Sequence, residues 1–275
     1  MKKVSVIIPT YKTGDYIYQC IDSLEKQTLS KHDFEVLIIL NGEKEPYYSK
    51  IKNYLETKNI DSKLFYTEVC GVSNARNIGL DNSQGENICF VDDDDWVSPY
   101  YLQNLHKLIN SDCIAISNIV KYDEKKQNYT SSSYTSKLKF NKKVPVIKYR
   151  SYLSNCGAKM IPISMINEKR FNTNFQNSED ALFMFSISDK LKYFNTSDKD
   201  SIYYIRRRSN SLSRVISISK SLINAINFVS ALTNVYIHNL SKYSFILFLT
   251  RLVAPLKLVI HRIISKSKKD LKYDK

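Results

Sequence analysis

The first 120 residues alternate short apolar runs with segments of helical periodicity. The apolar runs are Val4–Ile8, Phe34–Leu40, Lys63–Thr67, Ile88–Val91 and Cys113–Val120. Between them, apolar residues recur three and four positions apart, as in Asp15–Gln27, which is the spacing of one helix face. Strands that alternate with helices need crossover connections, and these build a mostly parallel sheet with helices on both faces. We therefore expect an α/β fold.

The rest of the chain is less regular. Residues 121–150 are polar and include three consecutive serines, Ser131–Ser133, so we expect a hairpin or a mobile loop. An apolar helix is expected at Ala181–Ile187, directly after Ser178-Glu179-Asp180. We predict a catalytic body over residues 1–213 and a helical C-terminal region over residues 214–275.

The strongest chemical signal is the run Asp92-Asp93-Asp94-Asp95, which directly follows the apolar run Ile88–Val91. Ligands bind at the carboxyl ends of parallel strands, and Tyr11 and Asn41 follow other strand ends, so these residues are expected to share one cleft. Clustered carboxylates repel one another, and a divalent cation relieves that repulsion. Oxygen ligands suit Mg²⁺ or Mn²⁺, which often bridge a carboxylate to a diphosphate. The alternative is a solvated acidic turn.

Other polar residues have both a chemical and a structural interpretation. Asp180 could act as a general base, or with Glu179 could simply stabilise a helix N-terminus. Tyr11 could stack on a base, or be a half-buried loop aromatic. Arg76 could hold a nucleotide, or form a surface ion pair. Arg206-Arg207-Arg208 could bind phosphate groups, or form a solvated basic loop.

The charge distribution argues against a nucleic-acid-binding protein, which a net charge of +14 would otherwise suggest. From residue 206 to the end of the sequence, 14 Lys and Arg stand against two acids, so the first 205 residues are nearly neutral. The six glycines fit neither a dinucleotide fingerprint nor a P-loop. Five scattered cysteines fit reduced thiols, and the first apolar run is too short for a signal peptide, so we expect a cytoplasmic protein.

Four segments, taken in order, resemble motifs of family 2 glycosyltransferases, including those that build bacterial capsules and lipooligosaccharides. The segments are Val4–Tyr11, Gly71–Gly79, Phe90–Trp96 and Ser178–Asp180. They are similar to the family's opening strand, its ARN-x-G segment, its DxD motif and its late ED motif. The resemblance implies a Rossmann-like sheet of the glycosyltransferase-A type.

The resemblance also implies roles for individual residues. Asp180 would deprotonate an acceptor hydroxyl, which attacks the anomeric carbon with inversion, and Asp94 would bind Mn²⁺ or Mg²⁺ on the diphosphate. The nucleotide site would comprise Thr10, Tyr11, Asn41, Arg76, Asp92 and Asp93. Contacts to acceptor or diphosphate would come from Trp96, Glu179, Arg206 and Arg207.

Two departures from the family pattern bear on specificity. The family usually has Asp-Asp after the second strand, where this chain has Leu40-Asn41. The Asn41 oxygen could accept from uracil N3–H, and its amide could instead donate to cytosine, so a UDP-sugar is expected while the base stays open. The chain also lacks a QxxRW segment, which resembles enzymes that add one sugar rather than processive synthases.

The C-terminal region has two apolar stripes. The first is Leu222, Ile226, Val229, Leu232 and Tyr236, and the second is Leu249, Leu252, Leu256, Val259 and Ile263. The cations Arg251, Arg262, Lys266 and Lys269 gather on another face. A basic amphipathic helix binds an anionic membrane surface, so we expect peripheral attachment to the inner face of the cell membrane; the alternative is packing on the body.

Together these features predict a metal-dependent, inverting glycosyltransferase. It would move one sugar from a nucleotide-sugar to a glycan or lipid-linked acceptor in surface polysaccharide synthesis. The alternatives are an inactive family member that binds nucleotide without turnover, and a basic nucleic-acid-binding protein.

Overall fold

The computed structural model describes residues 2–132, 135, 138–175, 177–208 and 218–255. Within these residues the main sheet has eight strands in the order β3-β2-β1-β4-β10-β6-β11-β9. Its first half is parallel and comprises β1 (Lys2–Thr10), β2 (Phe34–Asn41), β3 (Ser62–Thr67) and β4 (Gly85–Phe90). This half confirms the expected α/β fold.

The second half of the sheet is more mixed than predicted. It comprises β10 (Lys159–Pro162), β6 (Cys113–Ile116), β11 (Tyr193–Thr196) and β9 (Lys143–Pro145). Strand β10 runs antiparallel to both of its neighbours, and β9 runs antiparallel to β11.

A smaller sheet lies beside the main one. Over the described part of the chain its order is β5-β12-β7-β8, with β5 (Trp96–Val97), β12 (Ile202–Arg207), β7 (Asn118–Asp123) and β8 (Asn128–Ser131). The single strand predicted over Cys113–Val120 is therefore wrong. The segment divides at Ser117. The Ser117 N–H donates to the carbonyl of Ala158, just before β10 of the main sheet, and the Asn118 N–H donates to the carbonyl of Ser201, just before β12 of the smaller sheet. The hairpin expected within residues 121–150 is present as β7 and β8.

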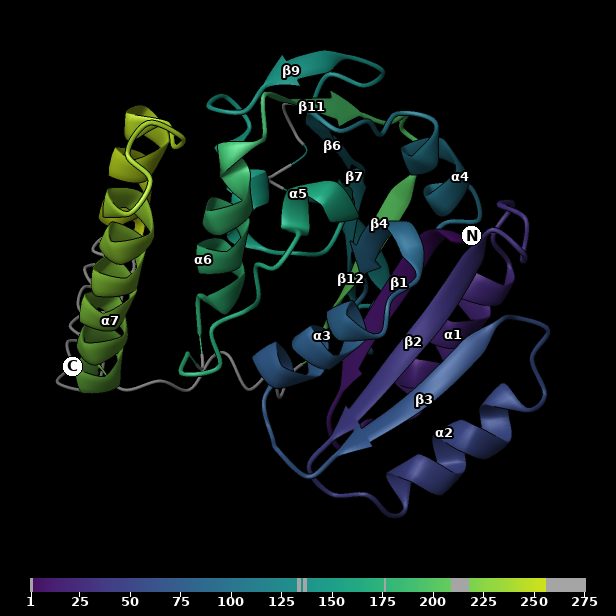
Figure 1. Ribbon diagram of the computed structural model, residues 1–275. Coiled ribbons are helices and arrows are strands. Elements are labelled where there is room, and N and C mark those ends of the chain that lie inside the picture. Colours follow the sequence, from purple (N-terminus) through teal and green to yellow (C-terminus); the bar gives the residue numbers. More distant parts are fainter. Residues whose placement is uncertain (1, 133–134, 136–137, 176, 209–217, 256–275) are drawn as a thin grey trace, which may run out of the picture.

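Helices pack on both faces of the main sheet (Figure 1). They are α1 (Tyr16–Glu25), α2 (Tyr47–Leu55), α3 (Val72–Asp81), α4 (Tyr101–His106), α5 (Ile163–Ile166) and α6 (Glu179–Ser186), with the 3₁₀ turns η1 (Arg150–Ser154) and η2 (Ile187–Asp189). Helix α3 approaches β1 and β2 closely at Gly79, where a Cβ atom would lie 2.4 Å from Cγ2 of Ile7. Only glycine allows this approach, which sets the depth at which α3 and its Arg76 sit.

The C-terminal region is helical, as predicted, with α7 (Ile218–Ile237) and a second helix over residues 245–255. It packs on α6, where Tyr243 stacks on Phe185 at 5.0 Å between ring centroids. Its two helices contact each other where Tyr236 stacks on Phe248 at 4.1 Å. Within the first predicted stripe Leu232 is buried, whereas Leu222 and Ile226 are exposed, so the stripe packs on the body only in part.

Part of the C-terminal prediction cannot be compared with the structure. The boundary between residues 213 and 214 and the second stripe beyond Leu252 lie outside the described residues, as do Arg262, Lys266 and Lys269. None of the helices in the described part of the chain is long and apolar enough to cross a bilayer.

Candidate active site

The four aspartates form a tight turn directly after β4, closed by a hydrogen bond from the Asp95 N–H to the Asp92 carbonyl. The Asp92 N–H donates to the Tyr203 hydroxyl at 3.1 Å, which connects the turn to β12. Asp95 is buried and accepts the Arg206 N–H at 2.9 Å, so its role is structural. Burial raises the pKa of Asp95 well above its usual range.

Arg76, on α3, lies between the aspartate turn and the start of α6. Its guanidinium pairs with Asp92 at 3.1 Å, with Glu179 at 3.5 Å and with Asp180. The Arg76 side chain is almost fully buried, so these ion pairs are screened by solvent less than surface pairs. Arg76 thus joins Asp92, 16 residues along the chain, to Glu179 and Asp180, which lie 103 and 104 residues along it. The alternative of a surface ion pair is wrong, because Arg76 is buried.

The Asp180 carboxylate is held at both oxygens. Oδ1 accepts from Arg76, and Oδ2 accepts the backbone N–H of Cys156 at 3.1 Å. Asp180 also begins α6 next to Glu179, where the helix dipole favours negative charge. Glu179 is mostly buried, and burial raises its pKa.

A buried lysine fixes the loop that contacts Asp180. Lys159, on β10, is fully buried, and its amine donates to the Asn155 carbonyl at 2.7 Å, the Asn155 amide oxygen at 2.9 Å and the Gly157 carbonyl at 2.6 Å. These bonds surround Cys156 on both sides. Burial lowers the pKa of Lys159 to about 8.

The ends of β1 and β2 form the opposite side of the site. Thr10 is buried and donates to Asp93 at 2.6 Å, and burial raises the pKa of Asp93 to about 7. Tyr11 is 43% exposed, and its ring lies on Gly42, where a Cβ would come within 2.8 Å of the ring. Tyr11 is therefore a solvent-facing aromatic surface at the carboxyl end of β1.

Asn41 is buried and bonded at both ends of its side-chain amide. Its nitrogen donates to the Thr10 carbonyl at 2.7 Å, and its oxygen accepts the Gly71 N–H at 2.9 Å. These bonds connect the loops after β1 and β2 to the start of α3. We therefore no longer expect Asn41 to read a base directly, because its polar atoms face protein backbone.

The basic cluster after β12 lies against the aspartate turn. The Arg206 Nε donates to the Asp94 carbonyl at 3.0 Å, and its guanidinium lies 4.9 Å from the ring centroid of Trp96. Arg208 pairs with the Asp94 carboxylate at 2.6 Å. Arg207 is exposed, and it follows Arg206 on a strand, where successive side chains point to opposite faces.

Trp96 is buried rather than open to an acceptor. Its ring stacks on Tyr204 at 5.1 Å and meets Tyr122 edge-on at 5.6 Å. An acceptor contact at this position would therefore involve Arg206 or the neighbouring tyrosines before Trp96 itself.

Within the described residues, no group of three or more His, Cys, Asp and Glu side chains has the geometry to hold a metal ion. The oxygen of Asp94 is chemically suited to Mg²⁺ or Mn²⁺, but it is a single carboxylate that already pairs with Arg208. A metal at this place would need the diphosphate of a ligand to complete its coordination.

Some residues of the site had no sequence signal. The Cys156 contribution is a backbone N–H, which any residue could supply, and Tyr203 is one of 20 tyrosines. Lys159 offered a weak signal, because it interrupts the apolar segment Ala158–Ile161.

Comparison with known proteins defines the family. The family described as "Glycosyl transferase family 2" matches residues 5–171, which is more than half of the chain. The chain belongs to this family.

Individual relatives of the chain are also glycosyltransferases by name. Glycosyltransferase GlyA of Streptococcus pneumoniae is 28% identical over 230 residues, which cover 78% of this chain and 32% of GlyA. This chain thus spans about a third of that relative. The poly(ribitol-phosphate) beta-N-acetylglucosaminyltransferase TarP of Staphylococcus aureus is 29% identical over 234 residues, which cover 82% of this chain and 68% of TarP.

A solved structure has the same fold. The crystal structure of S. aureus TarS residues 1–349 in complex with UDP-GlcNAc superposes with a TM-score of 0.73 at 20% identity, covering 92% of this chain and 73% of that chain. The match confirms the glycosyltransferase-A fold that the sequence motifs imply.

Proposed function

We propose that the protein transfers one sugar from a nucleotide-sugar to a hydroxyl group of a glycan or lipid-linked acceptor, with inversion at the anomeric carbon. The observation that carries this proposal is the Arg76 ion-pair cluster, which joins Asp92 of the aspartate turn to Asp180 at the start of α6. The carboxylate that we propose for the nucleotide site and the one that we propose for proton removal are thereby joined through one guanidinium.

In this proposal Asp180 is the general base. The acceptor O–H gives its proton to the carboxylate, the acceptor oxygen bonds to the anomeric carbon, and the bond to the diphosphate oxygen breaks. A carboxylate has about four lone-pair sites, so the bonds from Arg76 and Cys156 leave capacity for the acceptor hydroxyl. Those two bonds hold the carboxylate in a fixed orientation, which a general base needs.

The donor is proposed to be a UDP-sugar. The TarS structure named above holds UDP-GlcNAc, so this is the first donor to test. In this chain Tyr11 offers the exposed aromatic surface on which a base would stack, and Thr10, bonded to Asp93, holds the loop beneath it. Recognition of the base would then come from loop backbone that Asn41 positions, because the Asn41 amide is itself occupied.

A divalent metal is proposed to act with the donor. Asp94 would hold Mn²⁺ or Mg²⁺, and the bound metal would neutralise the charge that develops on the nucleoside diphosphate as it leaves. Arg206 and Arg208 already lie against the Asp94 carbonyl and carboxylate, so cations of the chain itself face the same region.

The acceptor is proposed to be a growing surface glycan. Two of the staphylococcal relatives are named as transferases that act on poly(ribitol-phosphate), which is an anionic polymer. Exposed Arg207 and partly buried Arg208 would suit such an acceptor as well as a diphosphate.

A donor panel tests the proposed function. Purified protein is incubated with Mn²⁺ and a set of UDP-, GDP- and CDP-sugars, and release of nucleoside diphosphate is measured for each. We expect release from one UDP-sugar, with binding of UDP itself. Lack of both binding and release for every donor would contradict the proposal and favour a family member that has lost activity.

A further inference from the structure

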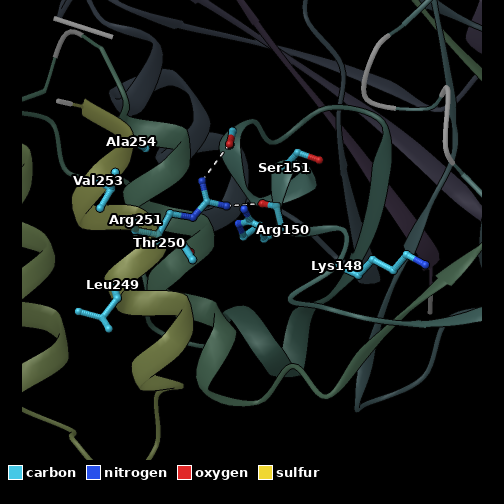
Figure 2. Close-up of a pocket in the computed structure, with 9 residues that line it drawn as sticks. Lys148, Arg150, Ser151, Leu249, Thr250, Arg251, Val253 and Ala254 are labelled. Carbon is cyan, nitrogen blue, oxygen red and sulfur yellow. Dashed lines mark hydrogen bonds between the residues drawn. The ribbon is translucent and has the colours of Figure 1, made fainter. Parts of the chain in front are cut away.

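Arg251, on the C-terminal helix over residues 245–255, points into the protein. It is only 5% exposed, although the amphipathic pattern of the sequence groups it with cations that face a membrane. Figure 2 shows its side chain directed toward η1, whereas Leu249 and Val253 point to the other side of the helix. A charged group is stable in a buried place only where hydrogen bonds replace the water that it loses. Strong hydrogen-bond partners are therefore needed to hold Arg251 in this position.

The Arg251 guanidinium bonds to both ends of η1. It donates to the Ser154 hydroxyl at 2.9 Å and to the Arg150 carbonyl, and the dashed lines in Figure 2 mark these bonds. The two acceptors lie 97 and 101 residues earlier in the chain. A guanidinium presents its N–H donors in a rigid planar fork, so it restricts both acceptors at once. Arg251 therefore joins the C-terminal helix to η1 and fixes the orientation of that turn.

The turn η1 leads directly into the loop that contacts Asp180. Asn155 follows Ser154, and the next residue, Cys156, donates its backbone N–H to the Asp180 carboxylate at 3.1 Å. Lys159 holds this loop from the downstream side through the carbonyl and the side chain of Asn155. The bond from the C-terminal helix to Ser154 holds the upstream side, two residues before Cys156. The loop beside the proposed base is thus fixed at both of its ends.

The C-terminal region also holds α6, the helix that carries Asp180 in its first turn. The Tyr243 hydroxyl donates to the carbonyl of Ser186, the last residue of α6, at 2.8 Å, and its ring stacks on Phe185. The turn η1 itself packs on α6. The C-terminal region therefore contacts both segments that meet at Asp180, namely the helix that carries the carboxylate and the turn that precedes its N–H donor.

We propose that Arg251 is a positioning residue for the general base, so that the C-terminal helix belongs to the unit that the chemistry requires. Arg251 fixes η1, η1 fixes the Cys156 N–H, and this N–H orients the Asp180 carboxylate. A small misplacement of a reacting group slows a reaction even when the change lies far from the chemistry. The inference rests on the proposed function, in which Asp180 takes the acceptor proton, and it extends that function to a region outside residues 1–213.

The substitution Arg251→Ala tests this role in the full chain. Values of kcat and donor KM are measured with the donor found in the panel, beside a thermal unfolding curve. We expect kcat per folded molecule to fall about tenfold, the lower end of the range for losing a hydrogen bond to a charged group, because Lys159 still holds the loop. Donor KM should stay within about twofold of wild type, because the change alters the proposed base rather than the proposed nucleotide site.

Guanidinium ion provides a readout that a loss of stability would not give. A pocket of about 630 Å³ lies beside Arg251 and opens to solvent, since exposed Lys148 and Arg150 are among its lining residues. Guanidinium chloride at millimolar concentration, far below denaturing levels, should restore most of kcat to Arg251→Ala, whereas equal sodium chloride should not. Because guanidinium destabilises folded proteins, a variant that is slow only through partial unfolding would lose activity instead.

Two further variants complete the design. Tyr236→Leu is the matched control, because it removes the stacking of Tyr236 on Phe248 between the two C-terminal helices and leaves the bonds of Arg251 to η1 in place. It should lower the melting temperature without changing kcat per folded molecule, and guanidinium should not activate it. Ser154→Ala removes one acceptor of Arg251 and should lower kcat about threefold. Combined with Arg251→Ala it should cause no additional loss, because both changes break the same bond.

The outcomes are distinct. A folded Arg251→Ala variant with the kcat of wild type overturns the positioning role, as does a loss of kcat that guanidinium leaves unchanged or that Tyr236→Leu reproduces. If Arg251→Ala does not fold, Ser154→Ala decides, and a wild-type kcat in that variant overturns the role. Absence of turnover in the wild type overturns the proposed function and this role with it. Normal turnover in the wild type and in the variants alike overturns only the role of Arg251.

Discussion

Replacing Lys159 with methionine should reduce turnover far more than it reduces stability. Lys159 is fully buried on β10, and its amine holds the loop that presents the Cys156 N–H to Asp180. Methionine has a similar length and keeps the site filled, but it cannot donate to the three oxygens. The loop then loses the bonds that fix its backbone beside the proposed base.

The stability effect is a difference between two opposing contributions. Burial lowers the pKa of Lys159 from 10.5 to about 8, so keeping this amine charged in the fold costs about 3 kcal/mol, which methionine removes. The carbonyls of Asn155 and Gly157 would lose their donor, at about 1–3 kcal/mol each. The net effect of these two carbonyls and the burial cost therefore lies between a gain of about 1 kcal/mol and a loss of about 3 kcal/mol, which a stable domain tolerates.

The effect on turnover has no such compensation. A hydrogen bond to a charged group contributes about 1.5–3 kcal/mol. If the Cys156 N–H leaves Asp180, the corresponding fall in kcat is about 10- to 100-fold.

The assay is release of nucleoside diphosphate from the donor found in the panel, measured as kcat and KM across pH, beside a thermal unfolding curve. Exposed Lys107 gives the matched control, Lys107→Met, which should change neither. A folded Lys159→Met variant with kcat within about twofold of wild type would refute the positioning role. The positioning role would also be refuted if the loss of activity were fully explained by the fraction of the variant that is unfolded.

Lys159 also gives a stability prediction with a definite sign. Its folded-state pKa of about 8 lies below the ordinary value of 10.5, so the unfolded chain binds more protons between these values. The stability of the wild type relative to Lys159→Met should therefore rise as pH increases from 8 to 10.5. Urea unfolding of the two proteins at the two ends of this range measures the difference.

Three further substitutions test other parts of the account. Burial raises the pKa of Asp93 to about 7, above its ordinary 3.8, so the folded state loses stability as pH rises through this range. Asp93→Asn should therefore raise the melting temperature above pH 7 but not near pH 4. Equal increases in melting temperature at both pH values would contradict this reasoning. Gly79→Ala should lower stability by about 1–3 kcal/mol in chemical denaturation, because its Cβ would lie 2.4 Å from Ile7, and an unchanged midpoint would show that α3 can shift freely. Arg76→Lys should lower kcat about 100-fold with the fold retained, because one ammonium group cannot bridge Asp92 and Asp180 as the guanidinium does. Near-normal turnover of this variant would show that the ion-pair cluster has only a structural role.

The sequence predicted the parallel half of the sheet well, because its strands are apolar runs with polar residues directly after them. Residues at those ends do lie near one another, and Arg76 joins Asp92 to Asp180. The division at Ser117 could not be predicted, since one apolar run continues through it and only the contacts with Ala158 and Ser201 turn the chain into another sheet.

Candidate site residues could be predicted where the chemistry of the side chain indicates a role, but not where a residue's role depends on backbone groups brought together by the fold. The carboxylates of Asp92, Asp94 and Asp180 could be recognised by type and position. The occupied amide of Asn41 could not, because its partners are backbone groups of distant loops. The pairing of Arg208 with Asp94 likewise depends on how β12 lies against the turn.

The central claim is that Asp180 removes the acceptor proton in an inverting transfer from a nucleotide-sugar. The most direct measurement compares wild type with Asp180→Asn in the presence of the identified donor and Mn²⁺. Donor binding is followed by calorimetry, and the anomeric configuration of the first product is followed by NMR. We predict inverted product from the wild type, and for Asp180→Asn a donor affinity within a few-fold of wild type with turnover reduced at least about 100-fold. Retained configuration, or an Asp180→Asn variant that turns over normally, would contradict the account.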